Sequence, residues 1–298
     1  VWRADRPQKG RFQEFYQCDA DVVGSKSLWQ EIEFIQLYDA VFSDLNLKGV
    51  TIKINNRKIL AGIAELIGAQ DKLIDFTVAL DKLDKIGAEK VKEEMLKKGI
   101  TSEGISKLEP LFNLTGDFSD QLQSLKSILS TSTEGIKGVE ELEFIASSVA
   151  ALGLKTAKLQ MDVTLARGLN YYTGAIFEVA APDSVQMGSI GGGGRYDDLT
   201  GIFGLKDVSG VGISFGLDRI YLVLEELNLF PTDKTLSTKV LFINFGTSES
   251  LYSLKAITAL RSKSIATELY PDAAKLKKQM IYCNKREIPY AVMVGESE

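Results

Sequence analysis

Histidine is absent from the 298 residues of this sequence. Without an imidazole the chain can form no Ser-His-Asp triad, no Cys-His pair, no HExxH zinc site and no histidine general base. Cysteine is scarce as well: Cys18 and Cys283 are too few for a disulfide framework or a zinc site of four thiolates, which favours a reducing compartment. Any catalysis must therefore use carboxylates, Arg, Lys, Tyr, backbone amides or an added metal.

Long apolar runs are missing too, because no stretch approaches the about 18 apolar residues that a membrane span needs; we expect no membrane protein. Six prolines and no low-complexity tract argue against a disordered chain. The composition, 45% hydrophobic and 25% charged, is typical of a soluble globular protein. Positive charge is in deficit, since the net charge is −5. The surface as a whole therefore does not attract nucleic acid, and any RNA or DNA partner would bind a local basic patch.

What is present begins with extended segments and then turns helical. Residues 2–17 place two extended pieces around a Pro/Gly turn and predict a hairpin with a charged loop. Apolar residues at helical spacing predict a helix over 27–45, and alternation predicts a strand over 50–54. From 59 to 154 the pattern is almost entirely helical, which predicts a helical insertion.

Strand character returns after the helical insertion. Residues 158–165 alternate apolar and polar side chains and 175–179 follow closely, so we expect these two strands to form an antiparallel pair. The polar face of the first strand is a candidate site surface, formed by Lys158, Gln160, Asp162 and Thr164. The glycine run 191–194 lacks the phosphate-loop and dinucleotide-binding patterns, so by itself it favours a tight, bulged strand crossing.

The last part of the chain predicts a domain of its own. A glycine-punctuated strand and an amphipathic helix over 211–227 are followed by a linker over 231–238. Residues 240–294 then follow the order β-α-β-α-β, which implies a small parallel or mixed sheet with its own core.

Four arginines stand where a ligand could meet them. Arg3 and Arg11 flank the first loop, Arg167 ends an alternating strand, and Arg219 lies at a strand-to-helix junction after several glycines. The planar, permanently charged guanidinium suits carboxylate and phosphate groups. Each arginine taken singly is explained as well by a surface ion pair. Together, beside glycines that let a ligand approach the backbone, they favour an anion-binding site.

Other polar side chains could complete such a site. Asp5, Gln17 and Asp21 could bind a cationic or amino-bearing ligand, or could be solvated surface groups. Tyr171 and Tyr172 are adjacent on a segment expected to be extended, so they would point to opposite faces, one into the core and the other toward a site.

Four segments, in this order, resemble the motifs of histidyl-tRNA synthetases, a family of class II aminoacyl-tRNA synthetases. Residues 3–17 resemble class II motif 2 in its histidyl form, and 166–174 resemble the histidine-specific signature RGLDYYTG. Residues 193–197 and 212–219 resemble the family's Gly-Gly-Arg-Tyr-Asp segment and class II motif 3. The signature element is highly specific, and the resemblance spans essentially the whole chain.

The resemblance implies an α+β fold: a class II synthetase antiparallel sheet core with helices, a helical insertion, and a C-terminal α/β anticodon-binding domain. The implied domains are the first part of the catalytic core with motif 2 (1–58), the helical insertion (59–154), the second part of the core with the histidine signature and motif 3 (155–232), and the anticodon-binding domain (238–298). Because the chain begins inside motif 2, we expect a fragment that lacks the motif 1 region and the C-terminal end.

The implied activity is ATP-dependent ligation of histidine to its tRNA through histidyl-adenylate. Arg3 and Arg167 would be catalytic and would hold the α-phosphate and the histidine carboxylate. Phe15 would stack on adenine, Asp5 would face the adenine amino group, and Arg219 would take the γ-phosphate. The implied ATP-binding residues are Arg3, Asp5, Arg11, Phe15 and Arg219.

The resemblance also implies how histidine would be bound. Asp21 and Tyr172 would hydrogen-bond the imidazole, whose two ring nitrogens need two directional partners. Gln17 would meet either the carboxylate or the α-amino end of the substrate, with Tyr196 nearby. The implied histidine-binding residues are Arg3, Gln17, Asp21, Arg167, Tyr171, Tyr172 and Tyr196.

The implied partners are ATP with Mg²⁺ bound to it, L-histidine and the histidine tRNA. The implied protein is a cytoplasmic homodimer with no membrane and no metal site of its own. The alternative is a synthetase-like regulatory subunit of ATP phosphoribosyltransferase in histidine biosynthesis. That paralogue typically lacks the anticodon-binding domain and degrades the histidyl signature. This sequence has both the domain and the signature.

Overall fold

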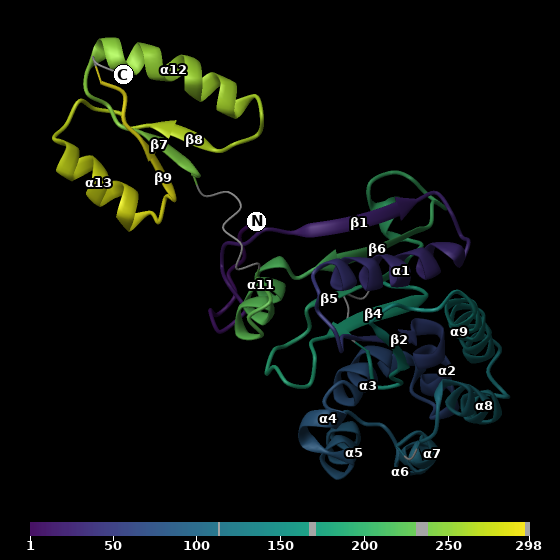
Figure 1. The fold of residues 1–298 in the computed structure, drawn as a ribbon. Helices are drawn as coiled ribbons and strands as arrows, with labels where there is room; N and C mark the ends of the chain where they lie inside the picture. Colours follow the sequence, from purple (N-terminus) through teal and green to yellow (C-terminus); the bar gives the residue numbers. More distant parts are fainter. Residues whose placement is uncertain (113, 167–170, 231–237, 296–298) are drawn as a thin grey trace. The chain divides into compact units, whose positions relative to one another are not determined.

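The computed structural model describes residues 1–112, 114–166, 171–230 and 238–295. The chain divides into two compact units, Val1–Phe230 and Pro231–Glu298 (Figure 1), and each is described by itself. Among the described residues, no helix has both the length and the apolar character to cross a bilayer.

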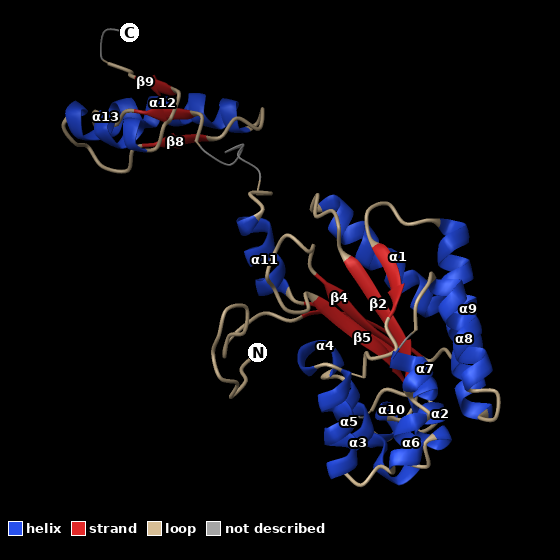
Figure 2. Ribbon diagram, turned by 90° about the horizontal axis from the view of Figure 1, so that it is seen from below, coloured by secondary structure: helices blue, strands red, loops and turns tan. Residues whose placement is uncertain are grey.

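The first unit is built on a six-stranded sheet with the order β1-β6-β5-β4-β2-β3. Every neighbouring pair is antiparallel except β2 and β3, which are parallel. This mixed sheet with its helices confirms the predicted α+β fold, and Figure 2 shows the strands as one layer with helices at its sides. The strands are β1 (Cys18–Val23), β2 (Thr51–Asn56), β3 (Lys158–Met161), β4 (Ala175–Ala180), β5 (Gly191–Tyr196) and β6 (Gly210–Phe215).

The glycine run is a regular central strand, so the predicted bulged crossing is wrong. Strand β5 pairs without interruption with β4 on one side and β6 on the other. Its glycines are needed for space: a Cβ on Gly193 would lie 2.1 Å from the Gly212 carbonyl oxygen, and one on Gly191 would lie 3.0 Å from the Tyr38 ring. The run therefore lets neighbouring strands and a covering helix approach closely.

The predicted antiparallel pairing of 158–165 with 175–179 is also wrong. Strand β3 ends at Met161 and pairs with β2, while β4 pairs with β2 and β5. Buried Asn55 donates to the carbonyl oxygens of Val163 and Leu165, at 3.1 and 2.9 Å, and so fixes the chain as it leaves β3. Strand β2 thus lies between the two segments, although it precedes both in the sequence.

Helices surround this sheet. Helix α1 places Tyr38 and Phe42 against Phe215 of β6, with ring centroids 4.9 and 6.1 Å from the Phe215 ring. In Figure 1 the helices α2 to α8 lie beside β2, on the side of the sheet away from β1. The helices of the unit are α1 (Trp29–Asp44), α2 (Arg57–Leu66), a 3₁₀ turn (Gln70–Lys72), α3 (Leu73–Leu80), α4 (Leu83–Ile86), α5 (Ala88–Lys97), α6 (Ser102–Ser106), α7 (Glu109–Phe112), α8 (Phe118–Ile128), α9 (Thr133–Leu152), α10 (Leu199–Ile202) and α11 (Leu217–Glu226).

The first residues form the predicted hairpin. Gln8 and Arg11 exchange backbone hydrogen bonds of 3.1 and 2.9 Å across a two-residue turn, in which Gly10 has φ +70°. A second bridge joins Trp2 to Glu14. A left-handed φ at the turn explains the glycine, because other residues adopt it at a cost.

The second unit has the predicted β-α-β-α-β order. Within its described residues, 238–295, three strands run parallel in the order β8-β7-β9, with one helix in each crossover. Leu241, Ile243, Tyr270, Cys283 and Ile288 form a buried cluster of its core. The elements are β7 (Val240–Phe242), α12 (Thr247–Arg261), β8 (Thr267–Leu269), α13 (Leu276–Lys285) and β9 (Tyr290–Val292).

Candidate functional site

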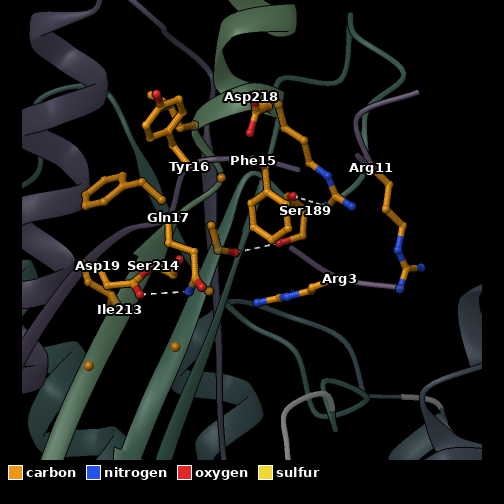
Figure 3. Close-up of a pocket in the computed structure, with 18 of the residues that line it drawn as sticks. Arg3, Arg11, Phe15, Tyr16, Gln17, Asp19, Ser189, Ile213, Ser214 and Asp218 are labelled. Atoms are coloured by element: carbon orange, nitrogen blue, oxygen red, sulfur yellow. Dashed lines mark hydrogen bonds between the residues drawn. The ribbon is translucent and has the colours of Figure 1, made fainter. Parts of the chain in front are cut away.

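A cavity of about 640 Å³ lies in the first unit, within the size range of small-molecule sites. The first hairpin, β1, β5, β6 and the start of α11 contribute its walls, so segments far apart in the sequence meet there (Figure 3). Of the residues predicted for the site, Arg167 lies outside the described residues. All the others line this cavity: Arg3, Asp5, Arg11, Phe15, Gln17, Asp21, Tyr171, Tyr172, Tyr196 and Arg219.

The pleat of the sheet decides which side chains reach the cavity. Successive residues of a strand point to opposite faces. Gly191 faces α1, so Gly194 and its partner Gly212 face the other side, where Asp21 lies. A Cβ on Gly212 would be 1.9 Å from the Asp21 carboxylate, which shows how closely that carboxylate covers the glycine. The glycines thus form a floor on which longer side chains lie.

Three tyrosines meet at one end of this floor. The ring centroids of Tyr171 and Tyr172 are 4.6 Å apart, and those of Tyr171 and Tyr196 are 6.3 Å apart. The prediction that Tyr171 and Tyr172 point to opposite faces is wrong: both line the cavity, and because they lie before β4 rather than in a strand, alternation does not apply.

The tyrosine hydroxyls are set to act as neutral donors. Tyr196 donates to Asp21 Oδ1 at 2.7 Å. Burial and this hydrogen bond raise the pKa of Tyr196, and burial followed by contact with Tyr171 raises the pKa of Tyr172. Both hydroxyls therefore keep their protons at neutral pH, while the Asp21 carboxylate accepts a hydrogen bond.

Arginines occupy the hairpin side of the cavity. The Arg3 guanidinium lies 4.9 Å from the centre of the Phe15 ring. Arg219 donates from Nε to the Gly10 carbonyl oxygen and from Nη1 to that of Ser189, each at 2.6 Å. These bonds attach the hairpin turn to the start of α11 and fix one guanidinium at the cavity wall.

Asp5 and Arg11 bind each other in this structure. Arg11 Nε donates to Asp5 Oδ2 at 3.2 Å, and Arg11 Nη2 lies 3.1 Å from Asp5 Oδ1. The two contacts make a two-point pair of planar groups, the geometry that favours arginine over lysine. The Asp5 charge is thereby neutralised on the hairpin side.

A buried ion pair supports the floor from the opposite face. Arg195, next to Tyr196, donates to both Glu31 carboxylate oxygens at 2.5 and 2.7 Å. Its other bonds go to the carbonyl oxygens of Ser25 and Ser27 and to the Ser209 hydroxyl. Burial opposes the charge of Arg195, but Glu31 outweighs it and raises the pKa of the guanidinium. The motif that contains Arg195 was visible in the sequence, whereas its partner on α1 was not.

The polar face predicted as a site surface lies outside this cavity. Lys158, Gln160, Asp162 and Thr164 are absent from the lining of the cavity, and β3 is an edge strand at the end of the sheet opposite β1. Asp162 instead accepts from Lys53 at 2.8 Å and from the Thr164 hydroxyl at 2.6 Å. Its role is to hold the turn after β3.

Sequence reasoning missed cavity residues beside those it named. Asp19, Ser214 and Asp218 line the cavity. Asp19 could have been found from alternation, because it lies two residues from both Gln17 and Asp21 on the same strand edge. Within the described ranges, no group of three or more Cys, Asp and Glu side chains is arranged to hold a metal ion.

A family model described as Histidyl-tRNA synthetase matches residues 1–220. The chain belongs to the histidyl-tRNA synthetase family. The histidine–tRNA ligases of Christiangramia forsetii and Flavobacterium johnsoniae are 70% and 69% identical to it over all 298 residues. The chain spans 65% and 63% of the lengths of these relatives.

A solved structure gives the same family. The crystal structure of histidyl-tRNA synthetase from Nostoc sp. PCC 7120 superposes with a TM-score of 0.85 at 31% identity. It covers 100% of this chain, which corresponds to 69% of the Nostoc chain. The resemblance inferred from the four motifs is thus confirmed at the level of the family.

Proposed function

We propose that the gene product containing this chain is a histidine–tRNA ligase, which forms histidyl-adenylate from histidine and ATP and then transfers the histidyl group to its tRNA. The observation that carries the proposal is the shared cavity, in which arginines stand on one side and carboxylates and tyrosine hydroxyls on the other. One ligand set fits this arrangement: a polyphosphate beside a small cationic amino acid.

The reaction suits a cavity built from a segment that contains no histidine. The histidine carboxylate attacks the α-phosphorus of ATP and pyrophosphate leaves, a step that needs charge stabilisation and positioning more than a proton transfer. Fixed guanidinium groups supply both, since their charge does not depend on pH. In this proposal Arg3 and Arg167 bind the α-phosphate and the substrate carboxylate.

ATP, carried with its Mg²⁺ as substrate, would lie on the hairpin side. Phe15 offers a ring for adenine, and Arg3 now lies on that ring in the place where a base could stack. Arg219, fixed by two carbonyl groups, would meet the γ-phosphate. Because Asp5 and Arg11 pair with each other, binding of the nucleotide would exchange that pair for contacts with adenine and phosphate.

The imidazole of histidine would lie at the tyrosine end. Asp21 accepts from Tyr196 and retains a second carboxylate oxygen for an N–H of the imidazole. Tyr172, with its raised pKa, would meet the other nitrogen as a hydroxyl. Two directional partners at fixed positions distinguish an imidazole from side chains of similar size.

The same proposal extends to the protein's surroundings. We propose a homodimer in the cytoplasm that binds the histidine tRNA, with the second unit as the anticodon-binding domain. The exposed free thiol of Cys18 is consistent with a reducing compartment. The alternative role as a regulatory subunit of ATP phosphoribosyltransferase is not favoured, because relatives 51–70% identical over the whole chain are named histidine–tRNA ligases.

The test is histidine-dependent exchange of pyrophosphate into ATP by the full-length gene product. Arg3→Ala should slow the exchange by about 100-fold, by comparison with loss of one preorganised charge-stabilising donor. Arg6→Ala is the matched control, because Arg6 belongs to the same hairpin but is not part of the cavity lining. Arg167→Ala is expected to abolish the exchange while leaving the fold intact.

The outcome that contradicts the proposal is equally specific. A folded full-length protein that binds histidine and ATP but exchanges no pyrophosphate is not a ligase. Equal losses in Arg3→Ala and Arg6→Ala would show that the hairpin matters only for its charge and would remove the role given to Arg3.

A further inference from the structure

Two neighbouring polar side chains lie on the cavity side of β1. Gln17 Nε2 donates to Asp19 Oδ2 at 3.0 Å. Figure 3 shows this pair at one side of the cavity and Arg11 at the other. Asp19 was not among the residues predicted from the sequence, and its contact with Gln17 bears on what Gln17 can bind.

The chemistry of the pair fixes the orientation of the Gln17 amide. An ionised carboxylate can only accept hydrogen bonds, so the amide nitrogen of Gln17 must face Asp19. The amide oxygen, Oε1, is then the atom left for a ligand. Among the described residues no group donates to Oε1, so this oxygen is available as an acceptor at the cavity wall.

The charge of Asp19 acts in the same sense. Within the described part of the chain no lysine or arginine forms an ion pair with Asp19, whereas Asp5 is neutralised by Arg11. Asp21, two residues further along β1, also lines the cavity and receives a neutral hydroxyl donor. This end of the cavity therefore presents two carboxylates and an amide oxygen, which favour a cation and disfavour an anion.

We propose that Asp19 is a positioning residue for the α-ammonium group of the amino acid substrate: it holds the Gln17 amide with its oxygen toward the ammonium and adds a negative charge beside it. The inference rests on the proposed function and deepens it. It assigns Gln17 to the amino end of histidine, one of the two roles that the sequence left open. The substrate carboxylate is then directed away from β1, toward the arginines.

The test uses Asp19→Asn in the full-length gene product. An asparagine can donate as well as accept, so the Gln17 amide loses its fixed orientation and the negative charge disappears. We expect the KM for histidine in pyrophosphate exchange to rise about tenfold, by the usual strength of a charge-assisted hydrogen bond, while the KM for ATP stays within about twofold. Asp19→Glu should recover part of the loss, because it restores the acceptor and the charge.

A substrate analogue separates this role from a structural one. Imidazolepropionate is histidine without its α-amino group, and it should inhibit the exchange competitively with the same inhibition constant in the wild type and in Asp19→Asn. Histamine keeps the amino group and lacks the carboxylate. Its affinity should fall from the wild type to Asp19→Asn by about the same factor as the affinity for histidine. If the substitution weakens the binding of imidazolepropionate and of histidine by the same factor, Asp19 merely shapes the pocket and the proposal is overturned.

Two further variants complete the design. Asp183→Asn makes the same change of charge at an exposed residue outside the cavity lining, and its constants should match the wild type. Gln17→Leu removes the amide and should reproduce the selective loss for histidine and histamine, which keeps the test decisive if Asp19→Asn fails to fold. Wild-type protein without histidine-dependent exchange would refute the proposed function itself. Normal exchange with no effect of either substitution would overturn only the role of Asp19.

Discussion

Asp39 shows how one side chain can satisfy the backbone hydrogen-bond donors of a distant segment. Its carboxylate accepts from the backbone N–H groups of Lys155, Thr156 and Ala157, at 2.6, 2.9 and 2.8 Å. These residues form the turn between α9 and β3, and the aspartate on α1 supplies the acceptors that the turn lacks. Burial disfavours the charge, but the three donors outweigh it and hold the pKa of Asp39 below its usual value of 3.8.

This shift predicts an acid-dependent contribution to stability. A carboxylate with a lowered folded-state pKa stabilises the native state above its unfolded pKa, and that contribution is lost as pH falls through the folded-state pKa. Asp39→Asn should lower the free energy of unfolding by about 2 kcal/mol near neutral pH. The difference between wild type and variant should shrink below pH 3.8, as measured by urea denaturation at several pH values. A difference that stays constant down to strong acid would show that Asp39 contributes no ionised acceptor.

At the scale of residues, the sequence identified much of the candidate site. Apart from Arg167, the side chains named from the motifs line one cavity, although what they bind stays a prediction. The sequence could not supply the partners that orient them. Glu31 and Arg195 are separated by 164 positions, and only the packing of α1 on the sheet brings them together. Asp19 was overlooked although strand alternation places it beside Gln17.

At the scale of elements, the crossing of α2 and α9 depends on glycine. Gly62 lies against Gly135, and a Cβ on Gly62 would be 2.6 Å from the Gly135 Cα. Helical glycine is unfavourable by itself, by about 1 kcal/mol relative to alanine. Its presence here is explained by the close approach of the two helices, because backbone rather than a flexible side chain stands in the way.

Gly62→Ala should therefore destabilise the protein despite the better helix propensity of alanine. We expect a net loss of about 2 kcal/mol, since the overpacking cost of about 1–3 kcal/mol exceeds the gain in propensity. Gly201→Ala in α10 is the matched control, because nothing lies within 4 Å of its added Cβ, and its stability should stay equal or rise slightly. Thermal unfolding of both variants measures this, and equal effects of the two substitutions would contradict the packing argument.

The two wrong predictions about strands also belong to this scale. Alternation in the sequence identified strands at β3 and β4 but could not say which strand each would pair with, because pairing is a property of two segments. Strand β2 precedes the helical insertion in the sequence, whereas β3 and β4 follow it, and β2 pairs with both of them. The prediction for the glycine run failed for a similar reason. Small residues are needed there because neighbouring groups approach the strand closely on both faces of the sheet, not because its own backbone bends.

At the scale of the whole molecule, the cavity belongs to one unit. All its lining residues fall between Arg3 and Arg219, within Val1–Phe230, and none comes from the described part of the second unit. The second unit has its own sheet and its own buried clusters. The proposed amino acid activation and the proposed tRNA binding can therefore be tested separately.

Truncation of the full-length gene product after Phe230 should separate these activities. Histidine-dependent pyrophosphate exchange should remain within about threefold of the intact protein, whereas charging of the histidine tRNA should fall by at least about tenfold through weaker tRNA binding. The intact protein assayed in parallel is the control. Loss of exchange by a truncated protein that still unfolds cooperatively would show that residues after Phe230 contribute to the cavity.

The sequence by itself determined the family, the segments that carry its motifs and the absence of histidine side chains from these 298 residues, because residue identities and their order are local facts. The tertiary structure decided which strands pair, that the two adjacent tyrosines face one cavity, and that Arg195 pairs with Glu31 of α1. Those outcomes depend on register and close packing between segments far apart in the chain, and no local pattern contains them.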